Sequence, residues 1–179
     1  MMTPLKQMTA LQANLAACLT CLAMMAFALF QQYVLGHLPC HLCILQRIAV
    51  IGLGVVFGLA AWHHPGKIGA RVYGSLLLFI AALGMGVAGR NVWVQLQPEG
   101  AVPACGAPLN VLLKMMPLRE ALMKVFWAGG ECHDVVWSLF GISLAGWVFI
   151  ALFALAVWAA YWNFIAQPRS RHDLNLARL

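Results

Sequence analysis

Four stretches of this sequence are each apolar over about 20 residues, the length that a helix needs to cross the ~30 Å hydrocarbon core of a bilayer. Only 9% of the residues are charged and 63% are hydrophobic, whereas a soluble domain usually carries about 25% charged residues. Backbone polar groups inside a bilayer must be satisfied within each segment, so these runs are expected to be helices. The sequence therefore predicts an all-α membrane protein, a single membrane domain built as a four-helix transmembrane bundle, with spans at about 11–35, 43–62, 72–92 and 139–164.

The first span is expected to stay in the membrane as an anchor. It is longer than the ~7–15-residue apolar core of a signal peptide, and no small-x-small cleavage site stands clearly after it.

The distribution of Lys and Arg predicts which ends of the spans face the cytoplasm. Six of the 11 basic residues lie in the N-terminal segment, the 63–71 turn and the C-terminal tail, while the short loop 36–42 holds none. Because basic loops stay cytoplasmic, both termini are expected on that side, and loops 36–42 and 95–137 on the other. The basic residues are spread along the chain and form no cluster interleaved with aromatic residues, so the net charge of +6 does not indicate a nucleic-acid partner.

One part of the long loop has the periodicity of a helix. Beyond Pro117, apolar residues recur at the i, i+3, i+4, i+7 and i+8 positions Leu118, Ala121, Leu122, Val125 and Phe126. The opposite face carries charged residues, and the segment is too short to span a membrane. We expect a short helix that lies flat on the outer membrane surface; the alternative is a helix packed on the other loop.

The stretch from Leu38 to Arg47 places a Cys-x-x-Cys pair where the second span begins. Cys40 and Cys43 follow Pro39, a residue that is tolerated in the first turn of a helix. On a helix that begins near Cys40, Cys43 and Arg47 share one face and lie one turn apart. The helix N-terminus and the guanidinium both favour a thiolate, the form of cysteine that attacks disulfides or donates electrons. We therefore expect a redox centre at the edge of the membrane.

The six cysteines divide between the outer loops and the first span. Cys18 and Cys21 lie in the middle of that span, where cysteine is expected to pack as a small hydrophobic residue. The loop cysteines are Cys40, Cys43, Cys105 and Cys132. On an oxidising side of the membrane they can form two disulfides in any of three connectivities. Cys40–Cys43 with Cys105–Cys132 is the simplest, and the pairings between loops are candidates for intermediates of a relay.

Other interpretations of these cysteines stay open. A Cys105–Cys132 bridge closes a long loop and can be purely structural, with a stabilisation of about 3–4 kcal/mol. A Cys40–Cys43 bridge closes almost no loop, so exchange suits it better than bracing. His37 and His41 could join the first pair as zinc ligands, although the fourth ligand would be uncertain. A c-type haem is not indicated, because Cys43 is followed by Ile and not by His.

Arg47 is the most unusual single residue in the spans. A charge one turn inside the membrane edge is costly, and ionisable residues at such positions are functional candidates by default. The alternative is an arginine whose head group extends to the lipid head groups. For Arg90, near the outer end of the third span, that alternative is the simpler explanation.

These motifs together resemble those of the disulfide bond formation protein B (DsbB) family. The matching features are Pro39-Cys40-x-Leu42-Cys43-x-x-x-Arg47, the run Gly89-Arg90-Asn91-Val92-Trp93-Val94-Gln95, Cys105, and Gly129-Gly130-Glu131-Cys132 with Trp137 shortly after. They occur in order over nearly the whole chain, and the Cys-x-x-Cys-x-x-x-Arg motif at the head of a second span is the most specific of them.

The resemblance implies a four-helix protein of the bacterial inner membrane. Such a protein reoxidises a soluble periplasmic thioredoxin-fold oxidase of the DsbA kind and passes the electrons to ubiquinone or menaquinone. The resemblance also implies that the reduced partner attacks Cys105, that Cys132 exchanges with Cys40, and that Cys43 faces the quinone.

The same resemblance predicts the quinone-binding residues. Arg47 is expected to polarise a quinone oxygen, and Arg90 and Asn91 are the further candidates. Many members of the family have a histidine where this chain has Asn91, which can donate a hydrogen bond but cannot supply a proton. Gln46 stands where the family often has Glu.

A non-enzymatic membrane protein is the alternative from another functional class. Its four spans would carry outer disulfides that only brace the loops. The redox state of the cysteines in membranes without quinone separates the two, because an electron carrier accumulates reduced cysteines there and a braced scaffold stays oxidised.

Overall fold

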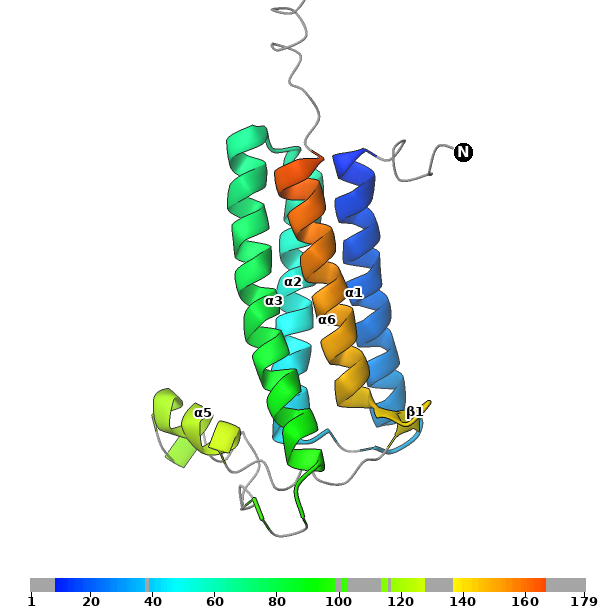
Figure 1. The fold of residues 1–179 in the computed structure, drawn as a ribbon, viewed down its shortest axis with the longest axis vertical. Coiled ribbons are helices and arrows are strands. Elements are labelled where there is room, and N and C mark those ends of the chain that lie inside the picture. The colour runs from blue at the N-terminus through cyan, green and yellow to red at the C-terminus, as the bar shows by residue number, and fades with distance from the viewer. Residues whose placement is uncertain are drawn as a thin grey trace, which may run out of the picture.

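The computed structural model describes residues 9–37, 39–98, 101–102, 114–115, 117–127 and 137–166. Its main elements are four long helices, a shorter helix and a two-stranded hairpin (Figure 1). The long helices are α1 (Ala10–Tyr33), α2 (His41–His63), α3 (Lys67–Gln95) and α6 (Leu144–Ala160), the last continued by a π-helical turn, Tyr161–Ile165. The shorter elements are α5 (Leu118–Trp127), β1 (Ser138–Leu139) and β2 (Ile142–Ser143).

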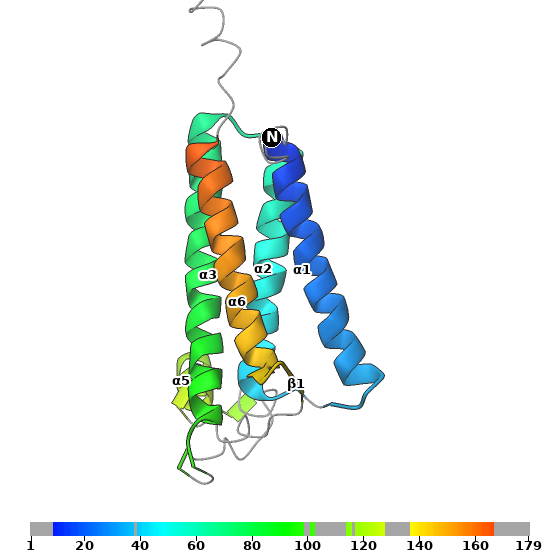
Figure 2. The same cartoon turned by 45° about the vertical axis from the view of Figure 1, so that its right-hand side comes forward.

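The long helices form an antiparallel bundle in which neighbours in sequence are neighbours in space. Helix α1 packs on α2, α2 on α3, and α3 on α6, while α1 and α6 touch at few places. Figure 2 shows α1 leaning away from the other three helices toward the end that carries β1. All four helices are long and apolar enough to cross a membrane. The predicted all-α fold with four spanning helices is confirmed.

Side chains at the helix starts explain where two of these helices begin. The Thr9 hydroxyl accepts a hydrogen bond from the Gln12 backbone N–H (3.3 Å), and the Gln12 side chain accepts one from the Thr9 N–H (2.9 Å). This reciprocal pair satisfies two of the N–H groups that a helix leaves open at its start. At α6 the Ser143 hydroxyl accepts from the Gly146 N–H at 3.3 Å. Helix α2 has no such side-chain cap, because its N-cap residue is Cys40.

The fourth span begins later than the sequence predicted. The prediction placed its start at residue 139, but Leu139 pairs with Ile142 in the β1–β2 hairpin, and α6 starts at Leu144. Phe140 and Gly141 form the turn with positive φ angles of 54° and 78°. This turn type matches the twist of a two-stranded hairpin. Leu139, Phe140 and Ile142 are as apolar as the helix that follows, so hydropathy did not reveal the turn at Phe140 and Gly141.

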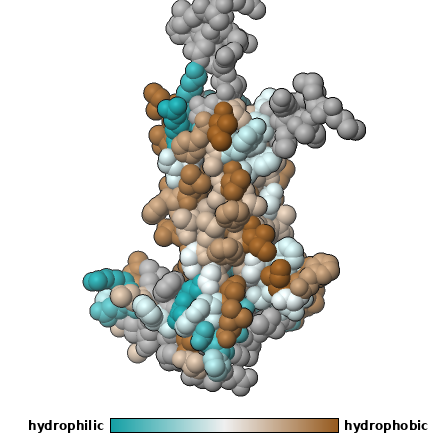
Figure 3. Space-filling model, in the orientation of Figure 1, coloured by the Kyte–Doolittle hydropathy of each residue, from teal (hydrophilic) through white to brown (hydrophobic). Residues whose placement is uncertain are grey.

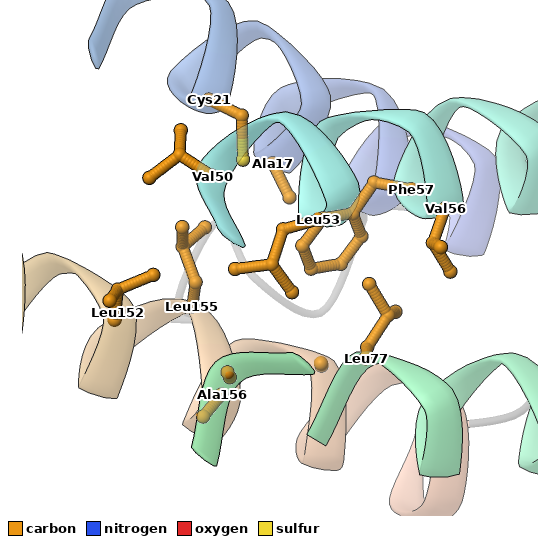
Figure 4. Packing of buried hydrophobic residues seen from close by; sticks show 12 residues of the cluster. Ala17, Cys21, Val50, Leu53, Val56, Phe57, Leu77, Leu152, Leu155 and Ala156 are labelled. Carbon is orange, nitrogen blue, oxygen red and sulfur yellow. The ribbon is translucent and has the colours of Figure 1, made fainter. Parts of the chain in front are cut away.

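The core lies at mid-height of the bundle, where all four helices contribute side chains (Figure 4). Phe57 of α2 and Leu77 of α3 are fully buried, and Leu152 of α6 is buried with them. The α1 residues in this core cluster are the small residues Ala17 and Cys21. Small residues let membrane helices approach closely, and van der Waals packing is the main attraction between them in lipid.

Glycines on α3 permit close contacts with both of its neighbours. A Cβ at Gly84 would lie 2.9 Å from the Ala49 Cβ of α2 and 3.0 Å from the Leu152 Cδ1 of α6. A Cβ at Gly74 would lie 2.8 Å from the Asn163 Cβ. No real Cβ fits at such distances, so these two positions fix how closely α3 lies against α2 and α6.

The outside of the bundle is apolar along the helices (Figure 3). Large hydrophobic side chains on all four helices are exposed, among them Leu22, Ile51, Phe79 and Phe153. A soluble protein rarely exposes apolar surface of this extent, and in a membrane protein it faces lipid.

The predicted helix in the long loop is present as α5. It lies beside the bundle at the end where α2 begins and α3 ends (Figure 1). Among its described side chains, Leu118, Met123 and Trp127 are exposed. Its position flat on the outer membrane surface stays a prediction.

A candidate redox site where α2 begins

Cys40 and Cys43 come together at the first turn of α2. Cys40 is the N-cap and Cys43 lies in the first turn of the helix, and both side chains are partly buried. Their sulfur atoms lie 3.0 Å apart. A disulfide brings two sulfurs to about 2.05 Å, so a small side-chain movement suffices to join them. The open N–H groups and the dipole of the helix N-terminus favour negative charge at Cys43.

Asn91 is the second component of the site, contributed by α3. Its side-chain Nδ2 donates a hydrogen bond to Cys43 Sγ at 3.5 Å and lies 4.0 Å from Cys40 Sγ. Asn91 is fully buried. Its Oδ1 accepts a hydrogen bond from Gln95 Nε2, one helical turn further on, at 3.4 Å. The structure thus brings a predicted quinone-binding residue against the predicted redox pair.

Arg47 of α2 forms hydrogen bonds to α1. Its guanidinium donates hydrogen bonds to the Gln32 side-chain Oε1 and, at 3.1 Å, to the Ala28 carbonyl oxygen. Both bonds join the outer parts of α1 and α2. Among the described residues, the hydrogen-bond partners of Cys43 Sγ are Cys40 and Asn91. The groups that favour negative charge on the Cys43 sulfur are therefore the N-terminus of α2 and the Asn91 amide. Arg47 lies one turn further along α2 than Cys43.

Two further amides near this end of the bundle are buried without full hydrogen bonding. Gln31, next to Gln32 on α1, is 3% exposed, and neither its Oε1 nor its Nε2 has a hydrogen-bond partner within the described part of the chain. Gln46, next to Arg47 on α2, is 4% exposed and its Nε2 has none there either. An unpaired buried amide costs about 1–3 kcal/mol, so such groups indicate a place where a ligand or water supplies the missing partner.

Arg90 packs against aromatic side chains at the end of α3. Its guanidinium lies 4.2 Å from the centre of the Trp93 ring and 5.8 Å from that of Trp127. It also donates a hydrogen bond to the Trp127 carbonyl oxygen at 3.1 Å. Arg90 therefore connects the end of α3 to helix α5 of the long loop.

The remaining predicted residues divide between the core and the undescribed segments. Cys21 is buried in the core and Cys18 packs against it, which confirms that this pair packs as small hydrophobic residues. Cys105 and Cys132 lie outside the described residues, and so does their predicted disulfide. Within the described ranges, no group of three or more His, Cys, Asp or Glu side chains is placed to hold a metal ion, so the zinc interpretation gains no support.

Sequence reasoning missed the three glutamines that line this end of the bundle. Gln32 holds Arg47, Gln95 holds Asn91, and Gln31 is buried with its amide open. Their polarity close to the ends of apolar runs was the available signal. That signal is weak, because helix ends at a membrane surface carry polar residues without any site.

Comparison with known proteins shows to which family the chain belongs. A family model described as DsbB, "Disulfide bond formation protein DsbB", matches residues 10–162. The chain belongs to the DsbB family. A "Disulfide bond formation protein B" from Saccharophagus degradans is 45% identical over 141 residues, which cover 77% of this chain and 85% of that protein. Proteins of the same name from Nitrosococcus oceani and Chromobacterium violaceum are 44% identical over 137 residues and 41% identical over 150 residues. The matches cover 76% and 84% of this chain, and 81% and 90% of those proteins.

DsbB membership confirms the resemblance that the motifs indicated. Members of the family are protein-disulfide:quinone oxidoreductases, so the chain is an oxidoreductase and a multi-pass membrane protein with four candidate spans. The alternative of a non-enzymatic scaffold loses its support. Membership also implies the use of a quinone and of a DsbA partner.

Proposed function

We propose that this protein reoxidises a periplasmic DsbA-like dithiol oxidase by a disulfide relay and passes the electrons to a membrane quinone. The observation that carries the proposal is the Cys40–Cys43 pair at the start of a spanning helix, with an amide hydrogen donated to Cys43 from α3. The proposed location is the bacterial inner membrane, with both termini cytoplasmic. The site would then lie at the periplasmic edge of the bilayer.

The relay needs a disulfide that accepts electrons readily. DsbA-type oxidants have potentials of about −120 mV, so an ordinary structural disulfide cannot reoxidise them. Whatever stabilises the reduced, negatively charged sulfur makes the disulfide a stronger oxidant. Here the N-terminus of α2 and the Asn91 amide both act in that direction at Cys43.

The proposed exchange steps use all four loop cysteines. A thiolate of the reduced partner attacks Cys105 of the Cys105–Cys132 disulfide, which forms a mixed disulfide and releases Cys132 as a thiolate. Cys132 then attacks Cys40, the Cys40–Cys43 bond breaks, and Cys43 leaves as a thiolate. The second thiol of the partner attacks the mixed disulfide and releases Cys105, so the partner leaves oxidised. Cys105 then attacks Cys132 of the Cys40–Cys132 bridge, which restores the Cys105–Cys132 disulfide and leaves Cys40 and Cys43 as the dithiol whose two electrons a quinone would accept.

The residues at this end of the bundle fit a quinone head group. A bound quinone supplies an acceptor for two electrons, and its two carbonyl oxygens accept hydrogen bonds. Arg47 and Asn91 are the proposed donors. The buried Gln46 Nε2 and Gln31 Nε2 are further donors, and neither has a hydrogen-bond partner among the residues that the structure describes. Arg90 stays a candidate, although its described contacts go to Trp93 and Trp127.

The direct test is turnover by purified protein with a reduced thioredoxin-fold partner. Short-chain ubiquinone and menaquinone analogues serve as alternative acceptors, and quinone absorbance reports the rate. Cys43→Ser should lose turnover by at least about 100-fold, because it removes the thiolate that faces the acceptor. Cys18→Ser is the matched control in the same membrane domain and should stay within about twofold of wild type. A Cys43→Ser variant that reduces quinone at the wild-type rate overturns the proposal.

The loop route and the orientation have separate tests. In a Cys43→Ser background the proposal predicts a trapped Cys40–Cys132 disulfide, detectable by mass spectrometry of alkylated protein. Labelling of Cys40 in intact cells by a membrane-impermeant maleimide, in a variant that keeps Cys40 as its sole cysteine, should place this residue on the periplasmic side. Protection of Cys40 until the inner membrane is broken contradicts the proposed orientation.

A further inference from the structure

The hydrogen bond between Gln95 and Asn91 engages the oxygen end of the Asn91 amide, while the nitrogen end faces the sulfurs. A carboxamide has a donor end and an acceptor end of nearly equal size, and rotation by 180° exchanges them. Asn91 is fully buried. Gln95 Nε2 donates to Asn91 Oδ1 at 3.4 Å, and this leaves Nδ2 toward Cys43 at 3.5 Å.

The orientation matters because the two ends act oppositely on a sulfur that gains charge. The nitrogen end places partly positive hydrogens beside the sulfur and stabilises a thiolate. The oxygen end places partial negative charge there and disfavours it, an effect that is strong in a site with little water. Gln95 lies four residues along α3, on the same face as Asn91, which is the spacing that lets the two amides meet.

We propose that Gln95 is a positioning residue that holds the Asn91 nitrogen toward the Cys40–Cys43 pair and thereby makes that disulfide a stronger oxidant. The inference rests on the proposed function, since it assigns a purpose to the potential of this pair. Reduction breaks the S–S bond, takes up two electrons, and leaves a thiolate and a thiol that binds one proton from solvent. Gln95 touches neither sulfur among the described contacts and acts through Asn91.

The experiment measures the redox equilibrium of the pair and not turnover. The full chain with Cys105→Ser and Cys132→Ser is equilibrated in detergent with mixtures of reduced and oxidised dithiothreitol, whose two thiols supply the electrons and become its cyclic disulfide. The reduced fraction is read by maleimide labelling after acid quenching. This measurement requires no quinone and no partner protein.

Gln95→Met keeps the size of the side chain and removes the donor. It should shift the equilibrium toward the disulfide by roughly three- to tenfold, which is about 15–30 mV because a tenfold change for a two-electron couple is about 30 mV. Gln95→Glu, which presents only acceptors when ionised, should shift it at least as far. Gln97→Met is the matched control on the same helix end, since Gln97 Nε2 donates to the Trp93 carbonyl oxygen at 3.5 Å, and it should shift the equilibrium less than twofold.

A double-mutant cycle shows whether Gln95 works through Asn91. In an Asn91→Ala background, Gln95→Met should have no further effect on the equilibrium, because no amide remains to be oriented. An equal shift in both backgrounds, or no shift in the wild-type background, overturns the proposal. Failure of the proposed function would show separately as an absence of quinone reduction by the wild-type protein, which leaves this equilibrium measurable.

Discussion

The chain contains two Cys-x-x-Cys pairs on neighbouring helices, and their surroundings differ. Cys18 and Cys21 lie inside α1, where Cys21 is buried in the core and a Cβ at Gly54 of α2 would lie 3.2 Å from its Cβ. Cys40 and Cys43 straddle the start of α2, with their sulfurs 3.0 Å apart and Asn91 donating to Cys43. The spacing is the same, so spacing alone does not make a redox pair.

The difference lies in what each backbone offers to a charged sulfur. Inside α1 the backbone N–H groups are used within the helix, and the neighbours are apolar side chains that disfavour charge. At the start of α2 the N–H groups are open and one turn of α3 adds an amide donor. We therefore expect the helix start and the facing amide to make Cys40 and Cys43 the more reactive of the two pairs.

Oxidation of each pair by itself should give the largest contrast. One full-chain variant keeps Cys40 and Cys43 as its sole cysteines, and the other keeps Cys18 and Cys21. Brief treatment with diamide should oxidise the first pair almost completely and the second by less than about a tenth, because the thiolate is the reacting form. Maleimide labelling of the remaining thiols, counted by mass, gives the answer. Equal oxidation of both pairs would mean that their surroundings do not matter.

Replacement of Arg47 should show whether this residue acts on the quinone or on the cysteine pair. Arg47→Lys keeps the charge but cannot make the same pair of hydrogen bonds to Gln32 and the Ala28 carbonyl. We expect KM for a short-chain quinone to rise by roughly tenfold and the redox equilibrium of the cysteine pair to move by less than threefold. Arg71→Lys is the control, because Arg71 lies near the start of α3, at the opposite end of the bundle from the cysteine pair. A large change in the equilibrium with unchanged KM would place Arg47 on the sulfurs instead.

Substitution of Cys18 or Cys21 should change the stability of the protein and leave its turnover almost unchanged. Cys21→Ser places a hydroxyl in an apolar core, which costs about 1–3 kcal/mol unless the group finds a partner. Thermal unfolding in detergent should show a lower midpoint, with the turnover number within about twofold of wild type. Cys18→Ser is the comparison and should have the smaller effect, because Cys18 is only partly buried. A loss of turnover at an unchanged midpoint would assign Cys21 a role in the chemistry.

The features that the sequence predicted well are those fixed by local pattern. Four long apolar runs can only be spans, and the start of α2 follows from Pro39 and the motif after it. The helical spacing of the apolar residues beyond Pro117 likewise predicted α5. In each case the deciding physics acts within one segment.

The features that escaped prediction depend on how segments meet. Asn91 and Cys43 are 48 residues apart in sequence, and their contact requires a particular vertical register of α3 against α2. The hydrogen bonds of Arg47 to α1 require the same of α1 and α2. Hydropathy leaves such registers open, because lipid-facing and core positions are equally apolar in a membrane protein. The hairpin before α6 was missed for the related reason that its strands are as apolar as the helix.

Gly84 has a consequence beyond close packing. It lies on the same helix as Asn91, about two turns deeper, and the absent side chain there lets α3 rest against Ala49 of α2. A larger side chain at that point would push α3 away from α2, and we expect this to lengthen the hydrogen bond from Asn91 Nδ2 to Cys43 Sγ. The geometry around the cysteine pair thus depends on a position two turns away along α3, so that a distant substitution is expected to disturb it.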